Sequence, residues 1–166
     1  MAIPDSLLIL AGFVFAHAAW SVSDLPKGEH LVPLAVVETA GQRQLLRFEA
    51  ETQEGAIIRG KASLRENEGS FDEWVFAREG QVLESGRYVD VLTIEGKAKG
   101  MTQSVIFVQR FQPFSTGQFK LVGEPVVSIG GKEIAPNESK QLIEKLYAGA
   151  RTHTKAAKLW GHWISP

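Results

Sequence analysis

Residues 7–20 read LLILAGFVFAHAAW, and this apolar run decides the fold. Only His17 interrupts it. Pro4 suits the first turn of a helix, and Asp5 places negative charge near the positive end of the helix dipole. Because apolar residues surround this helix on nearly all sides, the pattern predicts burial on more than one side, inside a sheet or under a partner chain.

The same run has one feature of a secretory signal, since Ala16-His17-Ala18 resembles a cleavage site. The preceding MAIPDS, however, lacks Lys and Arg, whereas a signal begins with positive charge. The run is also shorter than the roughly 20 residues that cross a bilayer. We therefore expect a retained helix, a cytoplasmic protein and no stable membrane insertion. Export, with residues 1–18 as a signal peptide, is the alternative.

Length and composition describe an ordinary soluble protein. The chain has 166 residues, 44% of them apolar, and a length of this order is typical of one domain, here residues 1–166. The absence of cysteine excludes thiol nucleophiles, redox cysteine pairs and Cys-ligated metal centres. We expect no cofactor.

The charges are nearly balanced, with 18 Lys and Arg against 19 Asp and Glu. Residues 111–166 carry seven basic and four acidic residues, a net charge of +3. This excess is small for a nucleic-acid footprint, so we expect no nucleic-acid partner.

From residue 31 to residue 129 the apolar pattern changes to period two, which indicates strands. Alternation over 56–64 and around Leu46, Phe48 and Ala50 predicts two neighbouring antiparallel strands joined by residues 52–55. Proline donates no ladder hydrogen bond, so Pro33 and Pro125 should lie at edges, strand starts or bulges. The other predicted strands are 31–38, 71–78, 88–95, 103–111 and 119–129.

Helical spacing returns at 137–147, where Asn137 is a candidate N-cap, and a further short helix fits 152–163. The links between the strands are too short for crossover helices, which disfavours parallel βαβ units. The expected fold is α+β. A curved antiparallel sheet of about seven strands, a meander or partial barrel, packs on the N-terminal apolar helix, followed by one or two C-terminal helices.

No catalytic motif is present, so a catalytic site would have to be assembled from scattered residues. His17 is the one catalytic candidate, because an imidazole inside an apolar helix needs a partner and loses proton affinity on burial. The sequence favours the other interpretation, a core histidine bonded to a strand carbonyl or to a carboxylate such as Glu38, because buried polar groups are normally hydrogen-bonded. Glu49 and Glu51, on one strand face, could be paired carboxylates, but the pattern favours a solvated cross-strand ion ladder with Arg59. His30 stands alone, and no histidines have the i, i+4 spacing of a metal site, so we expect no metal.

Aromatic residues on the strands could line an apolar cavity with a few polar points, as small-molecule sites do. The same residues would serve equally as a filled core, the interpretation that the close packing of protein interiors favours. The candidate ligand-binding residues are His17, Trp20, Trp74, Phe76, Tyr88, Phe107 and Arg110.

The C-terminal segment carries Trp160 and Trp163 on one helical stripe and basic residues on another. A stripe of this kind docks on the chain's own sheet or on a second copy, which makes a homo-oligomer through these tryptophans a candidate.

Three functional hypotheses follow. The first is a non-enzymatic protein that binds an apolar small molecule or a protein partner. The second is a cofactor-independent enzyme, an isomerase, cyclase or hydrolase, with a pocket histidine. The third is a homodimeric structural or interaction protein.

Overall fold

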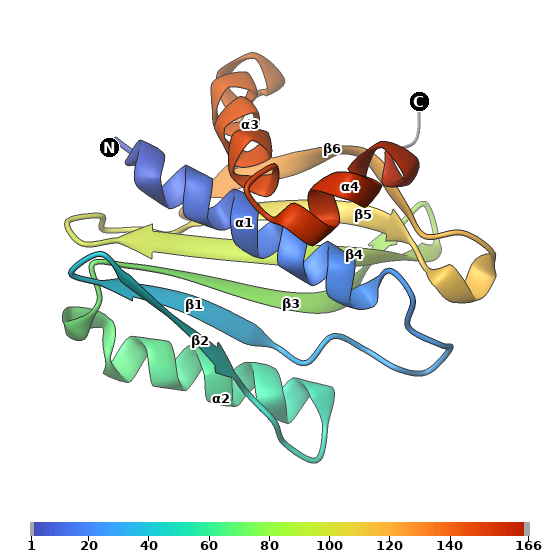
Figure 1. The fold of residues 1–166 in the computed structure, drawn as a ribbon, viewed down its shortest axis with the longest axis horizontal. Coiled ribbons are helices and arrows are strands. Elements are labelled where there is room, and N and C mark those ends of the chain that lie inside the picture. The colour runs from blue at the N-terminus through green and yellow to red at the C-terminus, as the bar shows by residue number, and fades with distance from the viewer. Residues whose placement is uncertain (1, 165–166) are drawn as a thin grey trace.

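The computed structural model describes residues 2–164, over which four α-helices surround a seven-stranded sheet (Figure 1). The helices are α1 (Asp5–Val22), α2 (Gln53–Glu66), α3 (Pro136–Ala150) and α4 (Thr154–Trp163). The strands are β1 (Leu34–Thr39), β2 (Gln42–Arg47), β3 (Glu73–Glu84), β4 (Arg87–Ala98), β5 (Val105–Gln112), β6 (Lys120–Ile129) and β7 (Lys132–Glu133). Two short 3-10 turns, η1 (Glu68–Ser70) and η2 (Phe114–Thr116), complete the described elements.

All neighbouring strands of the sheet are antiparallel, in the order β2-β1-β3-β4-β5-β6-β7. The sheet stays open, with β2 at one edge and β7 at the other. The predicted α+β class, the antiparallel sheet, the N-terminal helix packed on strands and the C-terminal helices are confirmed.

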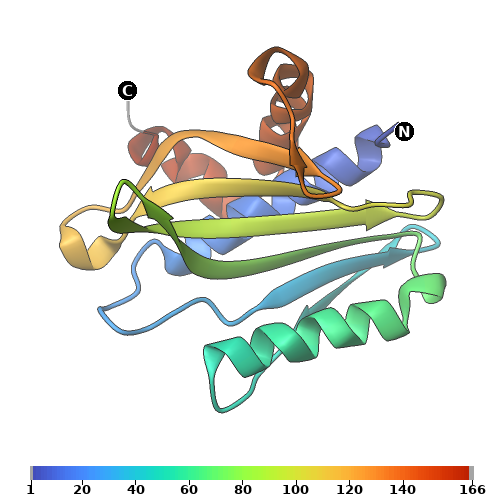
Figure 2. The ribbon, with the colours of Figure 1, turned by 180° about the vertical axis from the view of Figure 1, so that it is seen from behind.

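Helix α1 crosses one face of the sheet over β3 and β4, and α3 and α4 lie on the same side (Figure 1). Alternate strand residues, among them Val75, Ile94 and Phe107, point to this side and join α1 in the main core. The residues between them point to the other face, where α2 lies (Figure 2). Helix α1 therefore packs on the sheet on one side and against α3 and α4 on the others, which explains why apolar residues lie on almost every side of it.

By length and composition alone, α1 could cross a membrane, a test that buried core helices and signal sequences also pass. In this structure most of the helix is buried inside the protein.

The crossing of α1 and α3 depends on two glycines. Gly12 in α1 and Gly149 in α3 each lie against the backbone of the other helix, so that neither position has room for a Cβ atom. This close approach brings α3 onto α1 and lets Leu146 and Ile143 enter the core.

The prediction of a strand at 56–64 is wrong, because these residues belong to α2. Ala56, Gly60 and Leu64 are the buried positions of the helix. A spacing of four satisfies a period of two as well as a helical period, so the alternation did not discriminate between them. The predicted hairpin link is the helix start, where the Thr52 hydroxyl accepts the Gly55 amide proton at 3.0 Å.

The segments on either side of α2 also differ from the prediction. Strand β2 ends at Arg47 and pairs with β1 through a tight turn at Ala40 and Gly41, both of which have positive φ. Glu49 and Glu51 therefore lie in the exposed loop before α2 and not on a strand face. The short edge strand β7 has no counterpart among the predicted strands.

Pro125 lies at a bulge, as predicted. Strand β6 pairs with β5 at Val108↔Val126 and again at Arg110↔Val122, so three residues of β6 lie opposite Gln109. The buried Gln109 amide fills the bulge and donates to the carbonyls of Arg110, Val122 and Gly123 at 2.8–3.1 Å.

Candidate functional site

A groove runs between α2 and the sheet, and we call it the α2 groove. On this face of the sheet, helix α2 covers β1 and β3, whereas no helix lies over β5 and β6 (Figure 2). The groove contains two cavities, of about 350 Å³ and about 870 Å³, and Lys61 of α2 lines both. Volumes of this size are typical of small-molecule sites.

The smaller cavity has an apolar floor. Leu64, Phe76 and Trp74 line it. Phe76 is held in place by Phe48, whose ring packs edge-on at 6.0 Å between centroids, and by the bare Cα of Gly60, where a Cβ would lie 2.6 Å from the Phe76 ring. The indole Nε1 of Trp74 is buried and has no hydrogen-bond acceptor within residues 2–164.

Charged side chains form the walls of this cavity. Lys97 of β4 pairs with Glu68 at 2.5 Å, and the Ser104 hydroxyl donates to Glu95 at 2.7 Å. Lys61 has no ion pair among the described residues. Burial, and after it the nearby Arg78, lower the pKa of Lys61.

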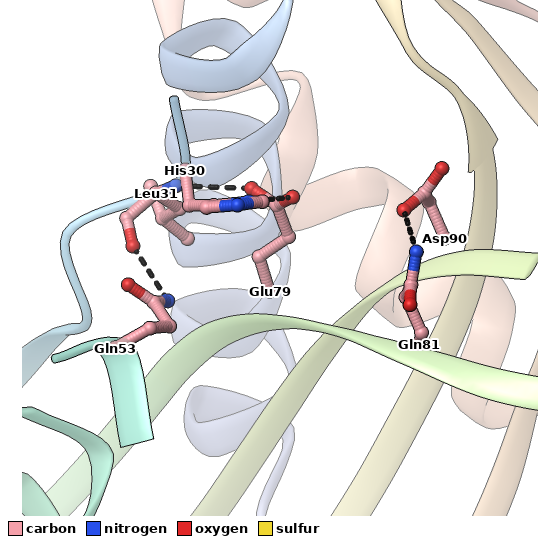
Figure 3. A network of polar contacts seen from close by, with 6 residues as sticks. All are labelled: His30, Leu31, Gln53, Glu79, Gln81 and Asp90. Atoms are coloured by element: carbon pink, nitrogen blue, oxygen red, sulfur yellow. Dashed lines mark hydrogen bonds and ion pairs between the residues drawn. The ribbon is translucent and has the colours of Figure 1, made fainter. Parts of the chain in front are cut away.

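A polar network lies at the other end of the groove, along the larger cavity (Figure 3). The Glu79 carboxylate contacts His30 Nδ1 at 2.9 Å and accepts the amide proton of Leu31 at 2.9 Å. Gln53 donates to the Leu31 carbonyl at 2.9 Å, which ties α2 to the loop before β1. Gln81 donates to Asp90 at 3.2 Å.

His30 is the polar residue that sequence reasoning treated as isolated. Its partner Glu79 is 49 positions away, on a part of β3 that extends past the predicted strand end. The only sequence signal was the pair of residue types, and no spacing rule connects them.

Two histidines, His17 and His153, contact each other on the opposite side of the sheet, between α1 and α4. His17 Nδ1 lies 3.1 Å from His153 Nε2. His153 Nδ1 accepts the Ala156 amide proton, so the neutral ring carries its proton on Nε2 and donates it to His17. His17 Nδ1 is thus an acceptor, and its proton sits on Nε2, which is buried without a partner among the described residues.

This arrangement argues against His17 as a general base. Burial lowers the pKa of both imidazoles, and for His17 the neighbouring His153 lowers it further. In the neutral pair the one lone pair of His17 faces the His153 N–H, so this ring has no free acceptor to offer a substrate.

The structure separates the seven predicted ligand-binding residues. His17 and Trp20 lie on α1, with ring centroids 5.9 Å apart. Phe107 is buried in the main core, and Tyr88 is 73% exposed. Arg110 pairs with Glu84. Trp74 and Phe76 are the two members that share a cavity.

The C-terminal tryptophans pack within their own chain. Trp160 meets Phe15 edge-on at 5.3 Å, and Trp163 meets Phe119 at the same centroid distance. Trp163 is almost fully buried.

Within residues 2–164, no three His, Asp or Glu side chains come together as a group that could hold a metal ion. The comparisons with known proteins found no matching family model, no matching curated protein and no matching solved structure.

Proposed function

We propose that this protein is a non-enzymatic binding protein that holds an apolar small molecule in the α2 groove. The observation that carries the proposal is the apolar floor of Leu64, Phe76 and Trp74 inside a cavity of about 350 Å³, which shares Lys61 with a larger cavity. The floor would receive the apolar body of a ligand, and the charged walls would contact its edge, as apolar and polar groups divide these roles in small-molecule sites.

The floor is held rigidly, which favours binding. Phe76 is 1% exposed and fixed between Phe48 and Gly60. The part of the floor open to a ligand belongs mainly to the half-buried Trp74, which packs against the cluster of Phe76 and Leu64, so binding costs little side-chain ordering.

The test is a titration of uniformly labelled full-length protein with the uncharged aromatic 2-naphthamide, followed by amide chemical shifts. Shifts confined to residues around Leu64, Phe76 and Trp74 support the proposal. The Ser104→Trp variant, which fills the cavity wall, should abolish them, and Ser115→Trp on η2 is the matched control. Absence of binding, or shifts elsewhere in the molecule, would contradict the proposal.

A cofactor-independent enzyme with a pocket histidine is the second candidate, and one observation favours it. His30 and Glu79 form a histidine–carboxylate pair on the wall of the larger cavity (Figure 3). A carboxylate on Nδ1 fixes the ring and leaves Nε2 to exchange protons. Turnover of ester or ketone substrates that is lost in His30→Gln and kept in His162→Gln would support this candidate over simple binding.

A homodimer through Trp160 and Trp163 stays a prediction. Sedimentation of the full chain at increasing concentration tests it, and Trp160→Ala should then shift the equilibrium to monomer.

We further propose that residues 1–18 are retained and that the protein is cytoplasmic. The support is the packing of α1, because its loss would strip the cover from β3 and β4. The intact mass of the protein from its native cells tests this, since export with cleavage would remove residues 1–18.

A further inference from the structure

Two cations face each other across the middle of the α2 groove. Lys61 on α2 and Arg78 on β3 both line the larger cavity. Neither forms a hydrogen bond or ion pair within residues 2–164, and the Nη1 atom of Arg78 is buried without a partner. A third cation, Arg65, lies one helical turn from Lys61 in the adjoining cavity. Lys61 and Arg78 therefore lie in the groove without a direct ion pair among the described residues, although acidic side chains also line it.

The acids that line the groove are occupied elsewhere. Glu68 pairs with Lys97, and Glu79 binds His30 and the Leu31 amide. Glu95 is the acid that electrostatically favours the charged form of Lys61, yet it lies beyond 4 Å of that amine and accepts from Ser104.

Two other acids lie further along the groove. Asp90 accepts from Gln81. Glu54 is exposed in the first turn of α2, seven residues from Lys61 and so about 10 Å along the helix. No lining acid therefore bridges Lys61 and Arg78.

We infer that Lys61 and Arg78 form an anion-binding centre, and that the ligand of the α2 groove is an amphipathic organic acid. Its acidic group lies between the two cations, and its apolar body lies on Leu64, Phe76 and Trp74. The inference rests on the proposed function and adds the chemical class of the ligand. A guanidinium binds a carboxylate through two parallel hydrogen bonds, and the ammonium adds a point charge from the opposite wall.

The experiment compares 2-naphthoate with 2-naphthamide, which share the ring and differ in charge. Both are titrated into the full-length labelled protein, and the dissociation constants are taken from amide shifts near Phe76. We expect naphthoate to bind at least about tenfold more tightly, as charge-assisted hydrogen bonds imply. Added salt should weaken naphthoate binding and leave naphthamide binding unchanged.

Variants locate the charge preference. Lys61→Gln and Arg78→Gln should each reduce naphthoate affinity about tenfold and leave naphthamide within about twofold. Lys158→Gln on α4 and Arg151→Gln after α3 are the matched controls and should change neither constant. Because the two cations have no partner within residues 2–164, their removal should not lower the melting temperature, which separates a binding role from a structural one.

The outcomes separate the two proposals. Equal binding of both compounds in the groove overturns the anion centre and leaves the proposed function standing. Binding of neither compound overturns both. A preference for naphthoate that survives in Lys61→Gln and Arg78→Gln places the anion elsewhere and overturns the inference.

Discussion

Gly12 of α1 and Gly149 of α3 face each other where the two helices cross. A Cβ atom built at Gly12 would lie 1.8 Å from the Leu146 carbonyl oxygen and 2.8 Å from the Gly149 Cα. A Cβ at Gly149 would lie 2.0 Å from the Ile9 carbonyl oxygen. Since the obstructing atoms are backbone, no side-chain movement can relieve the contact, and the two helices would have to separate.

Gly12→Ala and Gly149→Ala should therefore each destabilise the protein by about 1–3 kcal/mol or more, the usual cost of overpacking. Urea denaturation measures the change. Gly161→Ala is the matched control, because that helical glycine has open space around it and Ala favours helix by up to about 1 kcal/mol. Equal stability of Gly12→Ala and wild type would show that the helices do not cross this closely.

The Gln109 side chain provides a second test of the core. Its buried amide donates to three carbonyls at the β5–β6 bulge. Gln109→Leu keeps the volume but leaves those carbonyls unpaired, which should cost about 1–3 kcal/mol. The exposed Gln112, whose amide donates to the Gln118 carbonyl, is the control, and Gln112→Leu should stay within about 0.5 kcal/mol of wild type. A larger loss in the control than in Gln109→Leu would contradict the assignment.

The sequence was informative where a period was unambiguous. The apolar run of α1, interrupted only by His17, favours a helix buried on several sides. Within 137–147 the apolar residues come as adjacent pairs four positions apart, which alternation cannot produce: Leu142 and Ile143, then Leu146 and Tyr147. The segment 56–64 failed because Ala56, Gly60 and Leu64 fit both periods. Exposure would have resolved it, since Ile58, inward-facing in the strand interpretation, is 60% exposed.

The candidate site could not be predicted from the sequence, because it depends on 56–64 being a helix. With 56–64 read as a strand, Lys61 belonged to a solvated sheet face and had no relation to Arg78. The groove exists only because α2 rises above the sheet. The Glu79 contact of His30 likewise needs a loop to return along β3, and no local pattern encodes that path.

The His17–His153 pair predicts a loss of stability in acid. Burial lowers the pKa of both rings below 6.5, so the folded protein binds fewer protons than the unfolded chain once the pH falls below that value. Stability is full above about pH 6.5 and declines as the pH falls through the lowered folded values. The charged groups facing His17, namely Arg47 of β2 and Lys155 of α4, are cations and act in the same direction.

Urea denaturation between pH 7.5 and pH 5 measures this decline. His153→Asn keeps an N-cap for α4 and removes the titrating ring, so its stability should fall less steeply with acid than that of wild type. His162→Gln, on the exposed side of α4, should follow the wild-type curve. A wild-type stability that is constant or rises over this range would contradict the prediction.

Glu73 at the start of β3 should show the opposite dependence. Burial raises its pKa above 4.5, although the Ser6 hydroxyl donates to it, and Glu38 lies directly opposite on β1. The folded protein holds this proton more tightly than the unfolded chain, so the contribution of Glu73 is full below pH 4.5 and is lost as the pH rises through the folded value.

Glu73→Gln imitates the protonated form, keeps the contact with Ser6 and removes the repulsion from Glu38. We therefore expect it to be more stable than wild type at pH 7 and equal to it near pH 4, with the exposed Glu144→Gln unchanged at both. A Glu73→Gln protein that unfolds more easily at pH 7 would mean that the charged carboxylate is needed at the α1–β3 contact.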